Sequence, residues 1–158
     1  MSTPVASTGA KFYIANAAVY SEPANAAAYA ALTWVEVGDP ESIGPYGDEA
    51  QVITAATLQD SRVFKGKGPN DAGTLELTVL DRPDDTGQQA LIAAALALPN
   101  YAFKVELPNK LTSGGTNQLD YFIGLVTSQR INVGSAANII RRTFNIAINS
   151  KVTTTAAT

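Results

Sequence analysis

The sequence predicts a mainly β protein, a β-sandwich or partly closed barrel of about seven to nine strands with one flanking α-helix. Three observations support this class. Residues 73–79 alternate strictly between polar and apolar side chains, as a half-buried strand does. One helix-like apolar run lies at about residues 86–98, between acidic residues and a proline. Turn-forming residues separate the remaining short apolar runs, and about residues 37–72 form a long loop excursion.

The chain has 158 residues, which is enough for one domain of ordinary size. We expect a single domain over residues 1–158. Small and polar residues dominate both ends, so mobile arms are predicted at residues 1–10 and 150–158.

The first third of the chain contains two predicted strands, at residues 11–15 and 32–37. Residues 16–31 between them are rich in alanine but interrupted by Asn and Pro. Alanine favours helix and the breakers favour a loop. We therefore expect irregular structure there, with at most a short helical turn at residues 26–31.

The long excursion begins with an acidic segment at residues 38–49, where repeated Gly and Pro stop regular structure. Residues 50–55 and 61–65 can form two short strands, and residues 65–71 form a basic tip. Long excursions inside a compact domain are usually functional or disordered. Because catalytic chemistry is missing here, a contact with another copy of the chain is the preferred interpretation.

The run from Gly73 to Val79 is the clearest strand of the sequence. Its apolar face consists of Leu75, Leu77 and Val79, and its polar face of Thr74, Glu76 and Thr78. That polar face must meet water, a partner or a channel.

The helix at about 86–98 has candidate N-caps in Asp84, Asp85 and Thr86, and Thr86 with Gln89 fits a capping box. Pro99 ends the helix. Its sequence is apolar nearly all round, which predicts burial on several sides.

Three strands are predicted after the helix, at residues 101–107, 119–128 and 139–149. The middle run is apolar on both faces, as in a central strand. Arg142 falls on the apolar face of the last strand, so we expect it to pair with an acid of the same chain or a neighbour.

Composition excludes several classes of function. Cysteine and histidine are absent, which removes disulfides, thiolate metal sites and the Ser-His-Asp triad. We predict no enzymatic activity, no cofactor and no metal site. Apolar runs are too short for a membrane span. Charged residues are only 16% of the chain, which mildly favours an assembly whose surface is largely covered.

Charge is distributed unevenly. Residues 1–60 contain one base against seven acids, whereas residues 101–158 contain six bases against two acids. This asymmetry is either chance or head-to-tail complementarity, in which an acidic surface of one copy meets a basic surface of the next.

Three runs carry a resemblance to a known family. The first run spans residues 34–49 and begins with Trp34-Val35-Glu36-Val37-Gly38-Asp39-Pro40. The second spans residues 65–79 and begins with Lys65-Gly66-Lys67-Gly68-Pro69-Asn70. The third is Asp84-Asp85-Thr86-Gly87-Gln88-Gln89-Ala90-Leu91. They resemble the tail tube proteins, or major tail proteins, of long non-contractile-tailed bacteriophages (siphophages). The resemblance covers about residues 32–98, and the C-terminal strands fit more loosely.

The resemblance implies a structural virion protein that is assembled in the host bacterial cytoplasm. Six copies would form a ring, and stacked rings would form a tail tube for DNA ejection. One sheet per copy would line an inner barrel, through which viral DNA passes without specific binding. The long loop would reach the adjacent ring. The tape measure protein and tail terminator would be further partners. An acidic lumen would keep DNA from sticking, because a basic lining binds phosphates.

Two sets of candidate site residues follow. The ring-stacking or subunit-interface set is Asp39, Glu41, Asp48, Glu49, Lys65 and Lys67. The lumen-facing set is Thr74, Glu76, Thr78 and Glu106. Lys104 shares a strand face with Glu106, so it needs a partner or an outward position.

Two other functions stay open. A monomeric β-sandwich module that binds a ligand such as carbohydrate would use Trp34, Tyr46 and Tyr101 as a platform. A hydrolase would need two carboxylates held across a cleft. The acid pairs of this sequence are adjacent in turns or at the helix start, which makes hydrolysis the weakest hypothesis.

Overall fold

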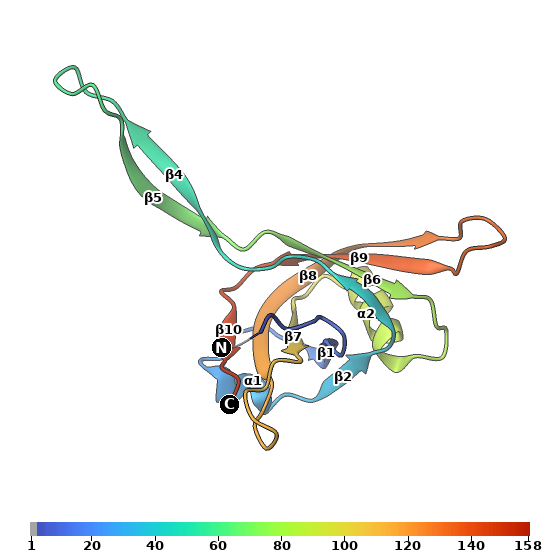
Figure 1. Ribbon diagram of the computed structural model, residues 1–158. Helices are drawn as coiled ribbons and strands as arrows, with labels where there is room; N and C mark the ends of the chain where they lie inside the picture. Colours follow the sequence, from blue (N-terminus) through green and yellow to red (C-terminus); the bar gives the residue numbers. More distant parts are fainter. Residues whose placement is uncertain (1–2) are drawn as a thin grey trace.

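The computed structural model describes residues 3–158, and most of its strands form one antiparallel sheet that curls around a core (Figure 1). The helices are α1 (Ala26–Ala30) and α2 (Thr86–Leu96). The strands are β1 (Lys11–Ala18), β2 (Trp34–Val37), β3 (Pro40–Ile43), β4 (Glu49–Ala55), β5 (Phe64–Asp71), β6 (Thr74–Leu80), β7 (Tyr101–Leu107), β8 (Gln118–Asn132), β9 (Arg141–Ile148) and β10 (Thr153–Thr155). The predicted mainly β class is confirmed.

Eight strands belong to the large sheet, in the order β2-β1-β7-β8-β9-β6-β3, with β10 paired beside β8. β8 is the longest strand and pairs with β7 through its first half and with β9 through its second half. A bulge between Val126 and Ser128 interrupts the second ladder. Bulges bend and twist a strand, which helps the sheet to curl without closing.

The concave face of the sheet holds the main core. Leu75, Leu77 and Val79 of β6 are fully buried there, and Phe144 and Ile146 of β9 lie beside them. The strict alternation read from the sequence therefore predicted the buried face correctly, because side chains of a strand alternate between its two faces.

Helix α2 covers part of this core and packs against β8, β2 and β1. Leu91 and Ala94 are its buried apolar residues. Asp85 is the N-cap and accepts a hydrogen bond from the Gln88 N–H. The predicted capping box of Thr86 and Gln89 is wrong, because the helix begins at Thr86 and Gln89 donates to the Pro83 carbonyl instead.

A second apolar cluster lies on the other face, centred on Tyr29 of α1 and Tyr121 of β8, whose rings stack 5.3 Å apart. Asn25 caps α1 by accepting from the Ala28 N–H. The predicted helical turn at residues 26–31 is thus confirmed. α1 covers this part of the convex face.

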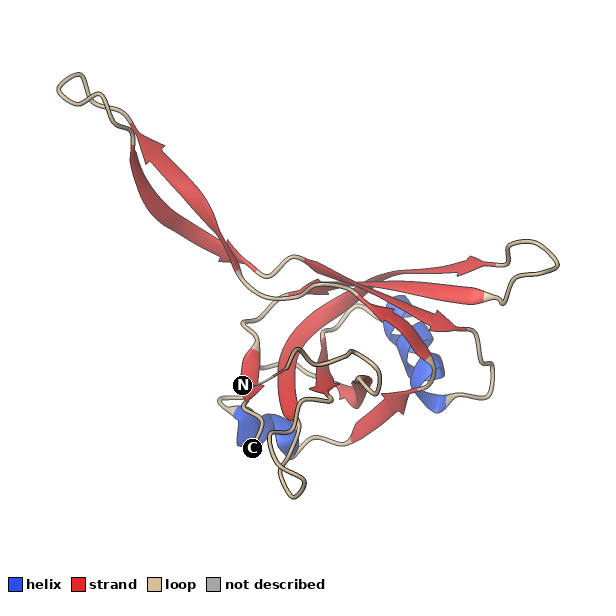
Figure 2. Cartoon of the chain, in the orientation of Figure 1, coloured by secondary structure: helices blue, strands red, loops and turns tan. Residues whose placement is uncertain are grey.

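The excursion at about 37–72 is present and contains two strands, as predicted, but its acidic segment, which was expected to lack regular structure, also contains a strand (Figure 2). Its first part forms β3, which pairs with β6 at the edge of the large sheet. Pro40 is tolerated there because an edge strand has one side without ladder partners. The rest is the two-stranded hairpin β4–β5, which projects from the body.

The two ends of the chain differ. Residues 3–9 lie outside regular elements and are exposed, and their mobility stays a prediction. The C-terminal segment was expected to be a free arm, but Thr153–Thr155 pair with β8 as β10. The Thr158 N–H donates to the Thr116 carbonyl at 3.0 Å. Within residues 3–158, neither helix is long and apolar enough to cross a membrane.

Candidate assembly surfaces

The β4–β5 hairpin is a ladder without a core. Its register runs from Glu49 opposite Asp71 at the root to Ala55 opposite Phe64 near the tip. Side chains from Gln51 to Lys67 are all exposed, including Val52, Ile53 and Phe64. An isolated hairpin is at best marginally stable in water. Exposed apolar side chains gathered on one projection are typical of a contact surface.

The candidate interface residues of the hairpin lie at different heights along it. Glu49 begins β4 at the root, and Asp48 precedes it. Lys67 lies opposite Val52, and Lys65 opposite Thr54. The two lysines were expected at a basic tip, but they lie within β5, and the tip is formed by residues 56–63. Their alternation places both on one face of the hairpin.

The other two candidate interface acids are paired within the same copy. Asp39 accepts a hydrogen bond from Arg82 at 3.0 Å, and both side chains are about half exposed. Glu41 binds Arg141 through two N–H groups, one of them at 2.9 Å. Hydrogen bonding from Arg141 lowers the pKa of Glu41. A partner on the next copy, which the sequence led us to expect, is therefore not needed to neutralise these two carboxylates.

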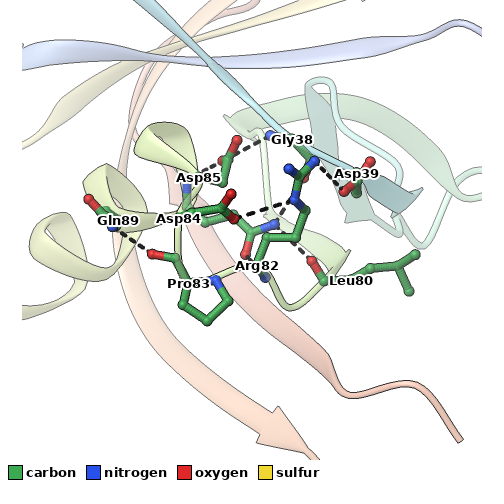
Figure 3. Close-up of polar contacts among 9 residues, drawn as sticks. Gly38, Asp39, Leu80, Arg82, Pro83, Asp84, Asp85 and Gln89 are labelled. Atoms are coloured by element: carbon green, nitrogen blue, oxygen red, sulfur yellow. Dashed lines mark hydrogen bonds and ion pairs between the residues drawn. The ribbon is translucent and has the colours of Figure 1, made fainter.

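A polar network joins the start of α2 to the link between β2 and β3 (Figure 3). Asp85 accepts from the N–H groups of Gly38, at 3.0 Å, and of Gln88. The Gln88 side chain is 1% exposed and uses its amide fully, accepting from Arg82 N–H and donating to the carbonyls of Gly38 and Leu80. Complete satisfaction of a buried amide makes such a network specific rather than costly.

Close packing accompanies this network. A Cβ built on Gly87 would lie 2.1 Å from the Glu36 carbonyl oxygen and 2.6 Å from the Val37 Cα. The first turn of α2 therefore touches the β2 backbone, and a glycine is required there. Sequence reasoning noticed neither Gly87 nor Gln88, although both lie in the run that carries the family resemblance.

A polar sheet face extends over β6, β9 and the second half of β8. Thr74, Glu76 and Thr78 of β6 lie on it, and of these Thr74 and Glu76 are exposed whereas Thr78 is partly buried. Thr78 and Thr143 hydroxyls are 3.4 Å apart, and the Asn145 amide donates to Ser128 at 3.0 Å. This polar face also carries Arg130, whose position follows from pairing opposite Thr143. The register places Arg141, which binds Glu41, on the same face. The face therefore carries the acid Glu76 and two arginines, and two pairs of its uncharged polar side chains bond to each other.

The fourth lumen candidate, Glu106, lies elsewhere. It belongs to β7, which β8 and β9 separate from β6 in the sheet order. Its carboxylate accepts hydrogen bonds from Tyr13, at 3.2 Å, and from Asn117, at 2.8 Å. The predicted lumen-facing set is therefore split between two regions of the sheet.

Lys104 finds its partners beside Glu106. Its ammonium lies 4.0 Å from the centroid of the Tyr13 ring and 5.2 Å from that of Trp34. Such cation–π contacts hold a half-buried ammonium. Burial lowers the pKa of Lys104, and the carboxylates of Glu106 and Glu36 oppose this shift. Burial, together with the same two carboxylates, raises the pKa of Tyr13 to about 12.

The carbohydrate platform does not form. The Trp34 indole donates to the Tyr29 carbonyl and packs beside Tyr121 on the convex side. Tyr46 packs beside Phe122, and Tyr101 packs against the main core. All three side chains are partly buried. Trp34 packs against the second cluster, whereas Tyr46 and Tyr101 pack against the main core, so the three rings do not share one exposed surface.

Sequence reasoning also missed a second extension and a buried acid. Ile131, Val133 and Ile139 are exposed near the end of the β8–β9 hairpin, which leaves the body on a different side from β4–β5 (Figure 1). Asp120 is 4% exposed and accepts from Tyr46 and Thr154. The sequence signal that could have revealed Asp120 is that it is the only acid within its apolar strand.

Within residues 3–158, no group of three or more acidic side chains is placed to hold a metal ion.

Comparison with solved structures shows the same fold. A chain of the SPP1 tail tube, solved by solid-state NMR and cryo-EM, is 12% identical with a TM-score of 0.66, covering 97% of this chain and 80% of that one. A chain of the anti-feeding prophage baseplate is 10% identical with a TM-score of 0.72, covering 99% and 98%. A chain of the sheath/tube terminator of the extracellular contractile injection system PVC is 13% identical with a TM-score of 0.69, covering 98% and 99%.

The sequence comparisons give the family. No curated protein matches the chain. A family model for the phage tail tube protein (TTP) matches residues 14–157, from within β1 to beyond β10. Because this match spans nearly the whole chain, the protein belongs to the phage tail tube protein family.

Proposed function

We propose that six copies of this chain form a ring and that stacked rings form the tube of a long non-contractile phage tail. The tube would be the conduit for DNA ejection. Membership of the tail tube family makes the chain a structural component of a phage tail. The projecting, coreless β4–β5 hairpin is the observation that carries the stacking step of the proposal.

The hairpin supports stacking because a single copy leaves it uncovered. Val63, Phe64 and Ile53 are each more than half exposed. Burying a side chain of this size contributes about 1.5–3 kcal/mol when burial is complete. A contact with the next ring would cover these side chains and hold the ladder. Lys65 and Lys67 would then meet acids of the neighbouring copy, while Asp48 and Glu49 contribute charge at the root.

The polar face of β6 and β9 is proposed to line the lumen. Thr74, Glu76 and Thr78 would face passing DNA there, beside Asn145 and Thr143. The two arginines of this face are offset by acids, since Arg141 binds Glu41 and Glu76 lies on the same face as Arg130, so phosphates meet little net positive charge. DNA would therefore slide without specific binding. Glu106 is less well supported in this role, since it lies on β7 among Tyr13, Asn117 and Lys104.

Other partners follow from the same proposal. The structures of similar fold include a tail tube, a sheath–tube complex and tube terminators. For this chain we propose contacts with a tail terminator at the end of the tube and with a tape measure protein inside it. The role is structural and not enzymatic, and assembly takes place in the host bacterial cytoplasm.

Electron microscopy of the concentrated purified chain tests the proposal. We expect tubes with a central channel, and six-fold symmetry in end-on class averages. Sedimentation at rising protein concentration should show large assemblies replacing a folded subunit. A species that stays monomeric at every concentration and salt would contradict the proposal, and tubes with another symmetry would contradict the hexamer.

A further inference from the structure

We propose that the groove at the root of the β4–β5 hairpin binds the same hairpin of a second copy. The inference rests on the proposed function and adds to it the receiving surface. The groove is a series of adjoining cavities of about 790, 110 and 470 Å³. Asn149 lines all three of them, so they form one continuous depression.

The groove has two chemically different ends. The end at the hairpin root is lined by Glu22, Asp48 and Asp71, together with the single base Lys151. The other end is lined by Tyr20, Leu98 and Leu125. Tyr20 is 89% exposed and Leu98 is 93% exposed, so this apolar end is open to a partner. A ligand for the whole groove therefore needs both basic and apolar side chains.

The hairpin carries these groups in the matching order. Leu58 and Val63 are exposed apolar residues of the tip, and Phe64 follows them. Lys65 and Lys67 come next along β5, toward the root. A hairpin laid along the groove would place its tip in the apolar end and its lysines beside the three carboxylates. Complementary charge fixes the direction of such a contact.

The occupant has to come from another copy. Asp48 and Asp71 are at once groove residues and the root of the hairpin. The ladder from Glu49–Asp71 to Ala55–Phe64 leads the strands away from that root (Figure 1). A paired ladder does not fold back on its own base without losing its hydrogen bonds. The tip of one copy would therefore meet the root of the next.

Such a contact joins two different surfaces of identical chains. Heterologous contacts of this kind close into rings or continue as open stacks. In each tip-to-root contact, the copy that supplies the tip keeps its own groove unoccupied. That groove can receive the tip of a further copy, so the contacts can repeat along a tube. This is the arrangement that ring stacking requires.

Cysteine cross-linking tests the contact, and the chain offers a clean background because it contains no cysteine. The test variants are Glu22→Cys/Lys65→Cys for the acidic end and Tyr20→Cys/Val63→Cys for the apolar end. The control is Lys110→Cys/Lys65→Cys, with Lys110 in the loop between β7 and β8. Each variant is assembled at high concentration, oxidised and separated on a non-reducing gel.

We expect both test variants to give a ladder of covalent oligomers well beyond the dimer, because each copy joins two others. Single-cysteine variants stop at the dimer, and the control should resemble them. Tubes that form without a ladder in either test variant would overturn the inference and leave the proposed function standing. A ladder equal in the control would overturn it too. A wild-type chain that stays monomeric would overturn both.

Discussion

The Tyr46 hydroxyl donates a hydrogen bond of 2.6 Å to the carboxylate of Asp120, and this bond ties the root of the projecting hairpin to the longest strand of the sheet. Asp120 also accepts from Thr154 of β10 at 2.7 Å and from Gln118. One buried carboxylate therefore joins three segments that are far apart in the sequence.

Removing the Tyr46 hydroxyl should destabilise the subunit. We expect Tyr46→Phe to lower the free energy of unfolding by about 1–3 kcal/mol, the usual range for a hydrogen bond to a charged group. Urea denaturation at pH 7 measures it. Tyr20→Phe is the matched control, because Tyr20 is exposed, and it should unfold like wild type. Equal stability of the two variants would contradict the importance of this bond.

Stability should fall in alkali because of two tyrosines. Burial and nearby carboxylates raise the pKa of Tyr13 to about 12, and burial and Asp120 raise that of Tyr46. The ordinary pKa is about 10. A raised folded-state pKa favours the neutral phenol, so its contribution is complete below pH 10 and is lost as pH rises toward 12.

The double variant Tyr13→Phe/Tyr46→Phe has no phenol at either position. We expect its unfolding free energy to fall less steeply than that of wild type above pH 10, as followed by circular dichroism in urea. Parallel curves for the two proteins would show that other groups cause the alkaline loss.

Gly87→Ala should be severely destabilising. The added Cβ would lie 2.1 Å from the Glu36 carbonyl oxygen, so α2 or β2 has to move. Overpacking typically costs about 1–3 kcal/mol, and a clash with backbone is at the upper end or beyond. Gly114→Ala is the control, since its Cβ would meet nothing within 4 Å. Thermal unfolding of the two variants should differ by several degrees.

Reversing the hairpin lysines should weaken stacking without unfolding the subunit. Lys65 and Lys67 are exposed and pair with no acid in the copy, among the residues described. We expect Lys65→Glu/Lys67→Glu to give short tubes or free rings in electron micrographs, with the circular dichroism spectrum unchanged. Lys11→Glu/Lys110→Glu makes the same change in net charge elsewhere and should keep long tubes. Full-length tubes from the hairpin variant would assign stacking to another surface.

A base on the polar face should make the tube hold DNA. Glu76→Lys adds two positive charges per copy on the face proposed to line the lumen, and phosphate binding by such charges weakens steeply with salt. We expect tubes of this variant to retain short DNA at low salt and release it as salt rises. Glu36→Lys, on β2 at the opposite edge of the sheet, is the control. If the Glu36→Lys tubes retained more DNA than the Glu76→Lys tubes, the lumen would lie on the part of the sheet that contains β2.

The sequence was most informative where local pattern and burial coincide. Leu75, Leu77 and Val79 were predicted as a buried face and are fully buried. Arg142 was expected to pair with an acid, and it binds Asp81 at 2.9 Å in the same copy, with both side chains largely buried. These predictions need only strand periodicity and the cost of an unpaired charge.

It was least informative where residues far apart in the chain meet. The partners of Asp39 and Glu41 are Arg82 and Arg141, and nothing in the local sequence points to them. β9 pairs only with the second half of β8, from Gly124 onward, so the same side of the first half of β8 is left without a partner. Thr153–Thr155 form a strand because they pair with that free part. The lumen and interface roles of the candidate residues stay predictions.

The sequence by itself determined the mainly β class, the single long helix, and which face of each strand is apolar, because these depend on propensity and on a period of two residues. Only the tertiary structure decided that β3 forms the sheet edge, that β4–β5 projects, and that Glu106 lies apart from Glu76. Strand order and register are set by the packing of the whole core, which no local pattern encodes.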